Sequence, residues 1–208
     1  MENDRLLKLV EAYQKHFKQY SRPDYNETEV RNDFVNPFFE ILGWDVQNKK
    51  NLPQHLREVK HEASVFVEEN GKQVKKKPDY EFHVGSTPYF FLETKKPNVD
   101  IMASKEAAFQ TRRYGWTGNL EISVLSNFTD TSVRPNENDK PSVAQVAHFH
   151  FTEYVDKFDE ISRLLSYETV VSGAFEKTFE NISSSLKKEP FDKYFLSQIK
   201  EWRLVLSE

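Results

Sequence analysis

The sequence predicts an α/β fold in which helices pack against one mixed β-sheet. Apolar residues recur at helical spacing across residues 5–42, change to strand-like patterns after Trp44, and return to helical spacing at residues 103–114. Two more strand-like segments and a helical C-terminal region follow. The predicted order is therefore two helices, three strands, one helix, two strands and then helices.

The composition limits the class of protein. A chain of 208 residues suits one domain of ordinary size, and 14% aromatic residues exclude disorder for most of it. The chain has no cysteine, which excludes disulfide scaffolds, zinc ribbons, iron–sulfur sites and thiol catalysis. We see no signal peptide and no apolar run that could span a membrane, and therefore expect a cytoplasmic protein with no membrane partner.

The charge is distributed unevenly. The net charge is −4, but residues 47–113 contain 13 Lys and Arg against 9 Asp and Glu. A basic middle between acidic flanks suits a protein that meets a polyanion with one face. A solvated surface without a partner would have the same pattern.

Two helices are predicted first. Residues 5–20 have an apolar stripe made of Leu6, Leu7, Val10, Tyr13 and Phe17. Asn26 resembles an N-cap whose capping-box partner is Glu29, and the helix that it starts should run to Leu42 and end at Gly43.

The remaining elements follow from turn signals and alternation. We expect strands at residues 59–68, 79–84, 89–95, 120–125 and 143–151, and a helix at 103–114. Asn70-Gly71 predicts a hairpin turn after the first strand. From Thr152 onward we expect helices, with a break near residues 183–190 and an amphipathic stretch at 191–206.

The most informative residues are Pro78-Asp79 and Glu93-Thr94-Lys95. If the hairpin between them is centred on Ser86, Asp79 and Glu93 lie equally far from the turn and face each other, with Cβ atoms about 5 Å apart. Lys95 lies on the same face as Glu93, because side chains repeat every two residues along a strand. The opposite face is filled by apolar residues, namely Tyr80, Phe82, Val84, Phe90 and Leu92.

This arrangement predicts a metal site. Two facing carboxylates repel each other, and a divalent cation such as Mg²⁺ or Mn²⁺ removes the repulsion. The lysine could then orient a water molecule or stabilise charge on a phosphate. Alternatively, Glu93 and Lys95 are ordinary surface residues. The preceding run Tyr89-Phe90-Phe91-Leu92 argues against that, because it is typical of a buried central strand.

Pro78-Asp79 and Glu93-Thr94-Lys95 resemble the motif of the PD-(D/E)xK nucleases. Further blocks resemble, in order, the nuclease domain of type I and type IIG restriction enzymes and its connector to a methyltransferase. They are Asn26-Glu27-Thr28-Glu29-Val30-Arg31 with Phe34 and Pro37-Phe38, Leu42-Gly43-Trp44-Asp45-Val46, Gln110 with Tyr114, Val124-Leu125-Ser126-Asn127-Phe128, Leu164 to Val170 with Gly173, and Phe195-Leu196 with Trp202-Arg203. The resemblance covers residues 24–206.

The resemblance implies a restriction-endonuclease-like αβββαβ core with extra helices at both ends. It divides the chain into an N-terminal helix (1–22), a nuclease core (23–152) and a helical connector (153–208). The implied reaction is Mg²⁺-dependent hydrolysis of double-stranded DNA by a type IIG-like site-specific deoxyribonuclease, with Mn²⁺ as a substitute. A transient dimer would make the double-strand cut. A downstream methyltransferase and specificity module would lie outside these residues, and S-adenosylmethionine would bind only there.

The resemblance also implies roles for individual residues. Asp79, Glu93 and the Thr94 carbonyl would hold the metal, and Lys95 would position or help deprotonate the attacking water. Gln110 would lie beside the active site, near the lysine or the DNA backbone. A plain polar rim of the helix is an equal alternative for Gln110.

The family has an acidic residue on the first core helix, and Glu27 and Glu29 are the candidates. With Glu27 at 0° and about 100° per residue, Phe34 lies at about 340°, Phe38 at about 20° and Glu29 at about 200°. Glu27 therefore shares the buried stripe and is predicted to bind a second metal or its water shell. Alternatively, Glu27 only stabilises the positive start of the helix.

Candidate DNA contacts are Gln110, Arg112, Arg113, Lys75, Lys76 and Lys77, although exposed basic residues without a partner are common. The sequence leaves a second function open: a nuclease-like fold that no longer cuts and serves as a DNA-docking or protein-interaction module. The presence of Asp79, Glu93 and Lys95 together favours the nuclease.

Overall fold

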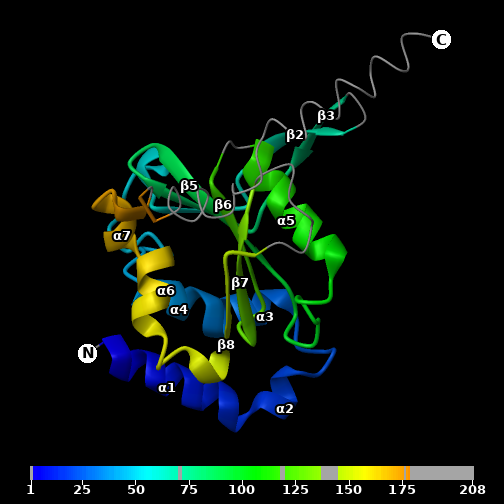
Figure 1. Cartoon of the computed structure of the whole chain (residues 1–208), viewed down its shortest axis with the longest axis vertical. Coiled ribbons are helices and arrows are strands. Elements are labelled where there is room, and N and C mark those ends of the chain that lie inside the picture. The colour runs from blue at the N-terminus through cyan, green and yellow to red at the C-terminus, as the bar shows by residue number, and fades with distance from the viewer. Residues whose placement is uncertain (1, 70–71, 118–119, 137–144, 176, 179–208) are drawn as a thin grey trace, which may run out of the picture.

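The computed structural model describes residues 2–69, 72–117, 120–136, 145–175 and 177–178. Its centre is a six-stranded sheet in the order β1-β4-β5-β6-β7-β8 (Figure 1). The strands are β1 (Val59–His61), β4 (Tyr80–Val84), β5 (Thr87–Thr94), β6 (Ile122–Ser126), β7 (Asp130–Pro135) and β8 (Ala147–His150). β5 pairs with β6 in parallel and the other pairs are antiparallel. The predicted mixed sheet of an α/β fold is confirmed.

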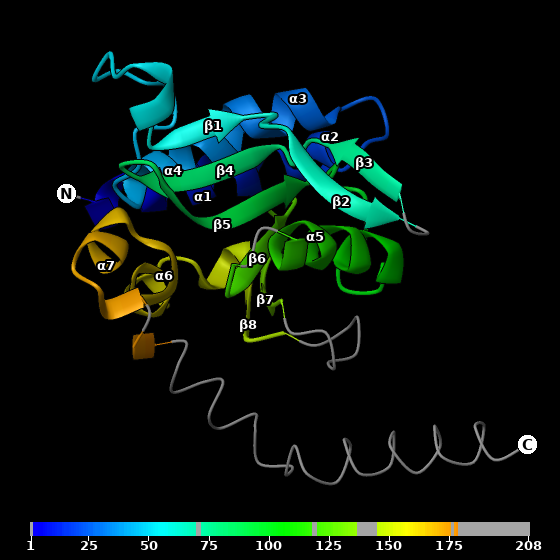
Figure 2. The same ribbon diagram turned by 90° about the horizontal axis from the view of Figure 1, so that it is seen from above.

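Helices cover both faces of the sheet. The elements are α1 (Glu2–Lys15), α2 (Phe17–Tyr20), α3 (Glu27–Val30), α4 (Asn36–Ile41), α5 (Lys105–Thr117), α6 (Phe158–Leu165) and α7 (Tyr167–Val171). Figure 2 shows α5 on one side of the strands and α1, α3 and α4 on the other. The strands therefore separate two layers of helices.

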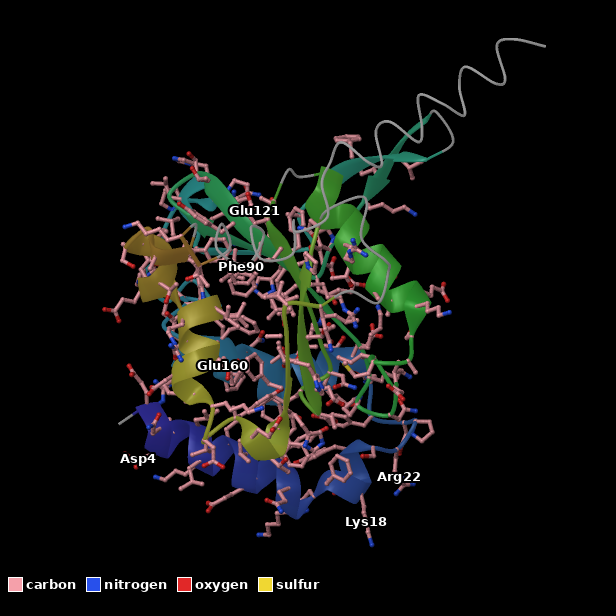
Figure 3. The ribbon with its side chains drawn as sticks, viewed as in Figure 1. Asp4, Lys18, Arg22, Phe90, Glu121 and Glu160 are labelled. Carbon is pink, nitrogen blue, oxygen red and sulfur yellow. The ribbon has the colours of Figure 1, made fainter. Side chains whose placement is uncertain are left out.

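The larger core lies on the side of α1, α3 and α4. Phe82, Phe90 and Leu92 point into it from β4 and β5, and Phe90 lies among the packed side chains of the interior in Figure 3. The residues between them face the other way: Phe91 packs with Val74 and Leu120. This alternation confirms the predicted apolar face of the β4–β5 hairpin.

The N-terminal helix is part of the same core. Leu6, Val10 and Tyr13 are buried, and the Tyr13 hydroxyl shares a hydrogen bond with Thr129 Oγ1 at 2.7 Å. Leu7, predicted on the apolar stripe, is 43% exposed. The stripe is therefore narrower than predicted.

The second predicted helix contains a π-helical turn. Asn26 accepts from the Glu29 amide and Glu29 accepts from the Asn26 amide, which confirms the capping box. Residues Arg31–Val35 then form the π turn, in which the Asn36 amide donates to the Arg31 carbonyl. Pro37 has no N–H to donate, so an ordinary α-helical ladder cannot continue through it. The helix ends at Gly43, whose φ of 93° confirms its predicted role.

The predicted strand at residues 59–68 is wrong as one element. The structure divides it into β1 and β2 (Val65–Glu69), and β2 forms a separate two-stranded sheet with β3 (Lys72–Lys76). Glu62 has a φ of 50°, and its amide donates to the Asp79 carbonyl. A left-handed residue cannot continue a strand, so the chain leaves the main sheet at Glu62.

Strand β7 was missed in the sequence. It pairs with β6 from Thr131 to Pro135, but Thr131, Ser132 and Arg134 are buried polar residues, so it lacks apolar alternation. The predicted strand at 143–151 is confirmed for residues 147–150, whereas residues 143–144 lie outside the described part.

Helices α6 and α7 confirm the helical prediction after Thr152. The Trp44 indole donates to the Leu165 carbonyl at 2.8 Å, and Leu165 is buried in the common core. The predicted break at 183–190 and the stretch 191–206 lie outside the described residues. Among the helices that the structure describes, none has the length and apolarity to cross a membrane.

Candidate active site at the end of strands β4 and β5

The β4–β5 hairpin brings Asp79 and Glu93 to the same end of the sheet. Tyr80 pairs with Leu92 and Phe82 with Phe90, in the register that the sequence predicts. The turn itself pairs Val84 with Thr87, and a one-residue shift between Phe82 and His83 brings the strands into this register. One further step in this register places Asp79 opposite Glu93.

The Asp79 carboxylate accepts hydrogen bonds from a strand of the sheet and from the helical layer that packs on it. Its Oδ2 accepts from the Thr94 amide at 2.7 Å and from the Thr94 hydroxyl at 2.5 Å. Its Oδ1 accepts from Arg31 Nη1 at 3.0 Å, and the Arg31 and Asp79 side chains are about one fifth exposed (19% and 20%). Strand β5 and the end of helix α3 therefore fix this carboxylate.

Glu93 is buried, with 6% exposure. Its Oε1 accepts from Lys95 Nζ at 2.9 Å and from Gln110 Nε2 at 3.1 Å. Its Oε2 is buried and has no hydrogen-bond partner. The structure thus places Gln110 beside the predicted site, in contact with the glutamate. A buried carboxylate oxygen without a partner is costly, and it is free to accept a further ligand.

The charges in the site are strongly coupled. Burial raises the pKa of Glu93, and the nearby charge of Asp79 raises it further against the opposing effect of Lys95. Burial would lower the pKa of Lys95, but its attraction to Glu93, its hydrogen bond to Glu93 and the charges of Glu27 and Asp79 together raise it. Lys95 is therefore held as an ammonium ion, and the charge of Asp79 opposes the ionisation of Glu93.

Glu27 and Glu29 have different surroundings. Glu29 is exposed and engaged in the capping box with Asn26. Glu27 is half-buried and its charge acts on Lys95. The helix phase predicted from the sequence is therefore correct over this turn.

Asp79 and Glu93 offer carboxylate oxygens, the ligands that Mg²⁺ and Mn²⁺ prefer. The unpartnered Oε2 of Glu93 is an available ligand atom. Within the described residues, however, no three histidine, aspartate or glutamate side chains form a group that could hold a metal ion, so Glu27 does not complete such a group. The residues fit a metal held by two carboxylates and supplemented by water or backbone oxygen.

The predicted DNA contacts fall into two groups. Lys75 and Lys77 are exposed and Lys76 is half-buried, at the end of β3 next to Asp79. The structure does not support the predicted DNA contact of Arg112, which is only 8% exposed and whose Nε donates to the Pro135 carbonyl at 2.7 Å. A buried guanidinium that anchors α5 to the end of β7 is not available to a phosphate. The side chains of Arg113 and Tyr114 lie outside the described part.

Neither the contact of Arg31 with Asp79 nor the hydrogen bond of the Thr94 hydroxyl to Asp79 was predicted from the sequence. A signal for Arg31 was present, because the helical wheel places it at about 40°, on the stripe that faces the sheet. An arginine on a buried stripe needs an anion nearby. No local signal distinguishes the Thr94 hydroxyl.

A mixed sheet that brings Asp79, Glu93 and Lys95 together at one end defines a PD-(D/E)xK nuclease domain. A family model described as type I restriction enzyme R protein N terminus matches residues 24–142. The chain belongs to this family of restriction-enzyme nuclease domains.

One curated relative extends the comparison beyond the matched region. The chain is 42% identical over 213 residues to the Type II restriction enzyme and methyltransferase RM.Eco57I of Escherichia coli. The match covers 98% of this chain and 21% of that protein, so the chain spans about a fifth of the relative's length. No solved structure matches the chain significantly.

Proposed function

We propose that this domain hydrolyses phosphodiester bonds of double-stranded DNA with Mg²⁺, as the nuclease domain of a type IIG-like restriction–modification enzyme. The observation that carries the proposal is the convergence of Asp79, Glu93 and Lys95 around a buried carboxylate oxygen that has no partner. An ordinary surface pair of Glu and Lys would not leave such an oxygen in the interior.

Asp79, Glu93 and the Thr94 carbonyl would hold the metal, with Glu27 acting through its water shell. When bound, Mg²⁺ would supply a Lewis acid that activates water and neutralises charge on the phosphate. Thr94 orients Asp79 through two hydrogen bonds, and Gln110 orients Glu93 through one. These contacts keep the carboxylates in place before substrate arrives.

Lys95 is proposed to donate to the attacking water or to a phosphate oxygen. Its ammonium is already aligned by Glu93 at 2.9 Å. In the reaction, the water oxygen forms a bond to phosphorus and the water gives up one proton, while one bridging P–O bond breaks and the leaving oxygen takes up one proton. Fixed positive charge in a partly buried site stabilises the negative charge that builds up on the phosphate.

We further propose that the natural polypeptide continues into a methyltransferase and specificity module, where S-adenosylmethionine would bind. The support is the name of the 42% identical relative and the small share of it that this chain covers. A transient dimer would cut both strands, as expected from the sequence.

A plasmid-nicking assay with Mg²⁺ tests the nuclease proposal. Lys95→Met should reduce the nicking rate at least about 100-fold, the size of effect seen when one transition-state donor is removed. Lys96→Met is the matched control, because the Lys96 ammonium donates to the Pro23 carbonyl outside the site. Equal nicking by the two variants would contradict the proposal and favour a DNA-docking module.

A further inference from the structure

Arg31 stands where the helical layer meets the end of the sheet. It is the first residue of the π-helical turn that follows α3, and its guanidinium lies 3.0 Å from Asp79 Oδ1. Both side chains are about 80% removed from solvent, with exposures of 19% and 20%. An ion pair at this depth is held more firmly than one on the open surface.

The hydrogen-bonding capacity of Asp79 is nearly filled by its contacts with Thr94 and Arg31. A carboxylate offers about four lone-pair positions. The amide and hydroxyl of Thr94 use Oδ2, and Arg31 uses Oδ1. Glu93 is different, because its Oε2 has no partner. Of the two predicted metal ligands, one is therefore available and the other is occupied by a cation.

The positive side chains are likewise divided between the two carboxylates. Each carboxylate has one cation of its own: Arg31 contacts Asp79 and Lys95 contacts Glu93. A divalent ion bound to Asp79 would add positive charge next to the guanidinium. Two cations that share one carboxylate weaken each other's binding.

We propose that Arg31 is a positioning residue that acts as the counter-ion of Asp79 in the metal-free protein and competes with the divalent cation for this carboxylate. The proposal rests on the metal site proposed above. Arg31 stabilises the metal-free protein and lowers its affinity for the divalent cation. Removing Arg31 should therefore lower stability but raise metal affinity, whereas removing a purely structural residue would not raise metal affinity.

The test is a Mn²⁺ titration of the chain and its Arg31→Met variant by calorimetry, without DNA. Coupling between two binding events typically changes affinity by about 5–150-fold, so we expect Arg31→Met to bind Mn²⁺ at least about fivefold more tightly. The melting temperature of the variant in chelator should be lower than that of the parent. Arg31→Lys keeps the charge and should remain close to the parent in Mn²⁺ affinity.

A second measurement keeps the proposal testable if Arg31→Met is poorly stable. In an Asp79→Asn background the counter-ion has no anion to neutralise, so adding Arg31→Met should leave the melting temperature in chelator unchanged. Weaker or unchanged Mn²⁺ binding by folded Arg31→Met would overturn the role of Arg31 but leave the metal site intact. Absence of Mn²⁺ binding in parent and variant alike would overturn both the metal site and this inference.

Discussion

Gln110 donates its side-chain amide to Glu93 Oε1 across 3.1 Å and so connects helix α5 to the strand that contains the Glu-x-Lys motif. The same oxygen accepts the Lys95 ammonium at 2.9 Å. Because both donors bind Oε1, the second oxygen of Glu93 is left without a partner in the interior. The orientation of the carboxylate is thus set by a helix that follows the motif in the sequence and covers it in space.

Replacing Gln110 by Leu should lower stability and cleavage together. The variant loses a hydrogen bond to a buried charged group, which costs about 1.5–3 kcal/mol. Urea unfolding in chelator measures the stability and plasmid nicking with Mg²⁺ measures the activity. Glu106→Gln, on the exposed part of the same helix, is the control. An unchanged nicking rate in Gln110→Leu would show that the orientation of Glu93 does not matter.

Metal binding should depend on Asp79. We expect Mn²⁺ binding in calorimetry that is abolished in Asp79→Ala, because one of two carboxylate ligands is lost. Mg²⁺ at 100 times its dissociation constant should raise the free energy of unfolding by about 2.7 kcal/mol, and chelator should reverse the gain. Asp33→Asn removes an exposed carboxylate that accepts from Tyr25 and serves as the control. Equal Mn²⁺ affinity in Asp79→Ala and Asp33→Asn would refute the assigned site.

Substitutions of Glu27 and Glu29 should affect different properties, namely the cleavage rate for Glu27 and the stability for Glu29. Glu27→Gln should reduce cleavage, because its charge acts on Lys95. Glu29→Ala should cost about 0.3–1 kcal/mol of stability through the helix start and leave the cleavage rate unchanged. Nicking assays and urea unfolding of both variants provide the comparison. The reverse pattern would mean that the cap, and not the face toward the sheet, supports catalysis.

The domain alone should bind DNA weakly and without sequence preference. A net charge of −4 and a local excess of basic residues at 47–113 allow only a few phosphates to be neutralised. We expect a dissociation constant of about 10⁻⁴ M at physiological salt, with a slope of about −0.9 per phosphate in a logarithmic plot of affinity against salt. Fluorescence anisotropy with two unrelated duplexes measures both quantities.

Charge reversal locates the DNA surface. Lys75→Glu with Lys77→Glu should reduce the magnitude of the salt slope by about two, one unit for each lost phosphate contact. Lys8→Glu with Lys18→Glu changes the net charge equally at exposed positions on α1 and α2, and Figure 3 shows Lys18 pointing outward. If the Lys8 and Lys18 substitutions weaken binding as much as those of Lys75 and Lys77, the region around β3 is not the DNA surface.

Local sequence determined the starts and ends of several elements. Asn26 and Glu29 are three residues apart and cap each other, and Gly43 ends the helix with a φ of 93°. These capping signals act over a few residues, so the sequence alone was enough to predict them. The register that pairs Tyr80 with Leu92 was also predicted, but it depends on the shift between Phe82 and His83, because the turn itself pairs Val84 with Thr87.

The split of residues 59–68 was not predictable in this way. Val59 belongs to the main sheet and Val65 to the two-stranded β2–β3 sheet, although both lie in one apolar-rich run. The break depends on Glu62 donating to the carbonyl of Asp79, the residue that directly precedes β4. Alternation in the sequence shows that a strand is favoured but not which sheet it joins.

The same distinction applies to the site. The approach of Asp79, Glu93 and Lys95 could be predicted from local sequence, because all three lie at the open end of one β-hairpin. Only the tertiary structure placed Arg31 against Asp79, 48 residues away, buried Arg112 against Pro135, and left one oxygen of Glu93 without a partner. The physical reason is that these contacts depend on how the helices pack on the two faces of the sheet, and helix packing is decided by the whole core rather than by neighbouring residues.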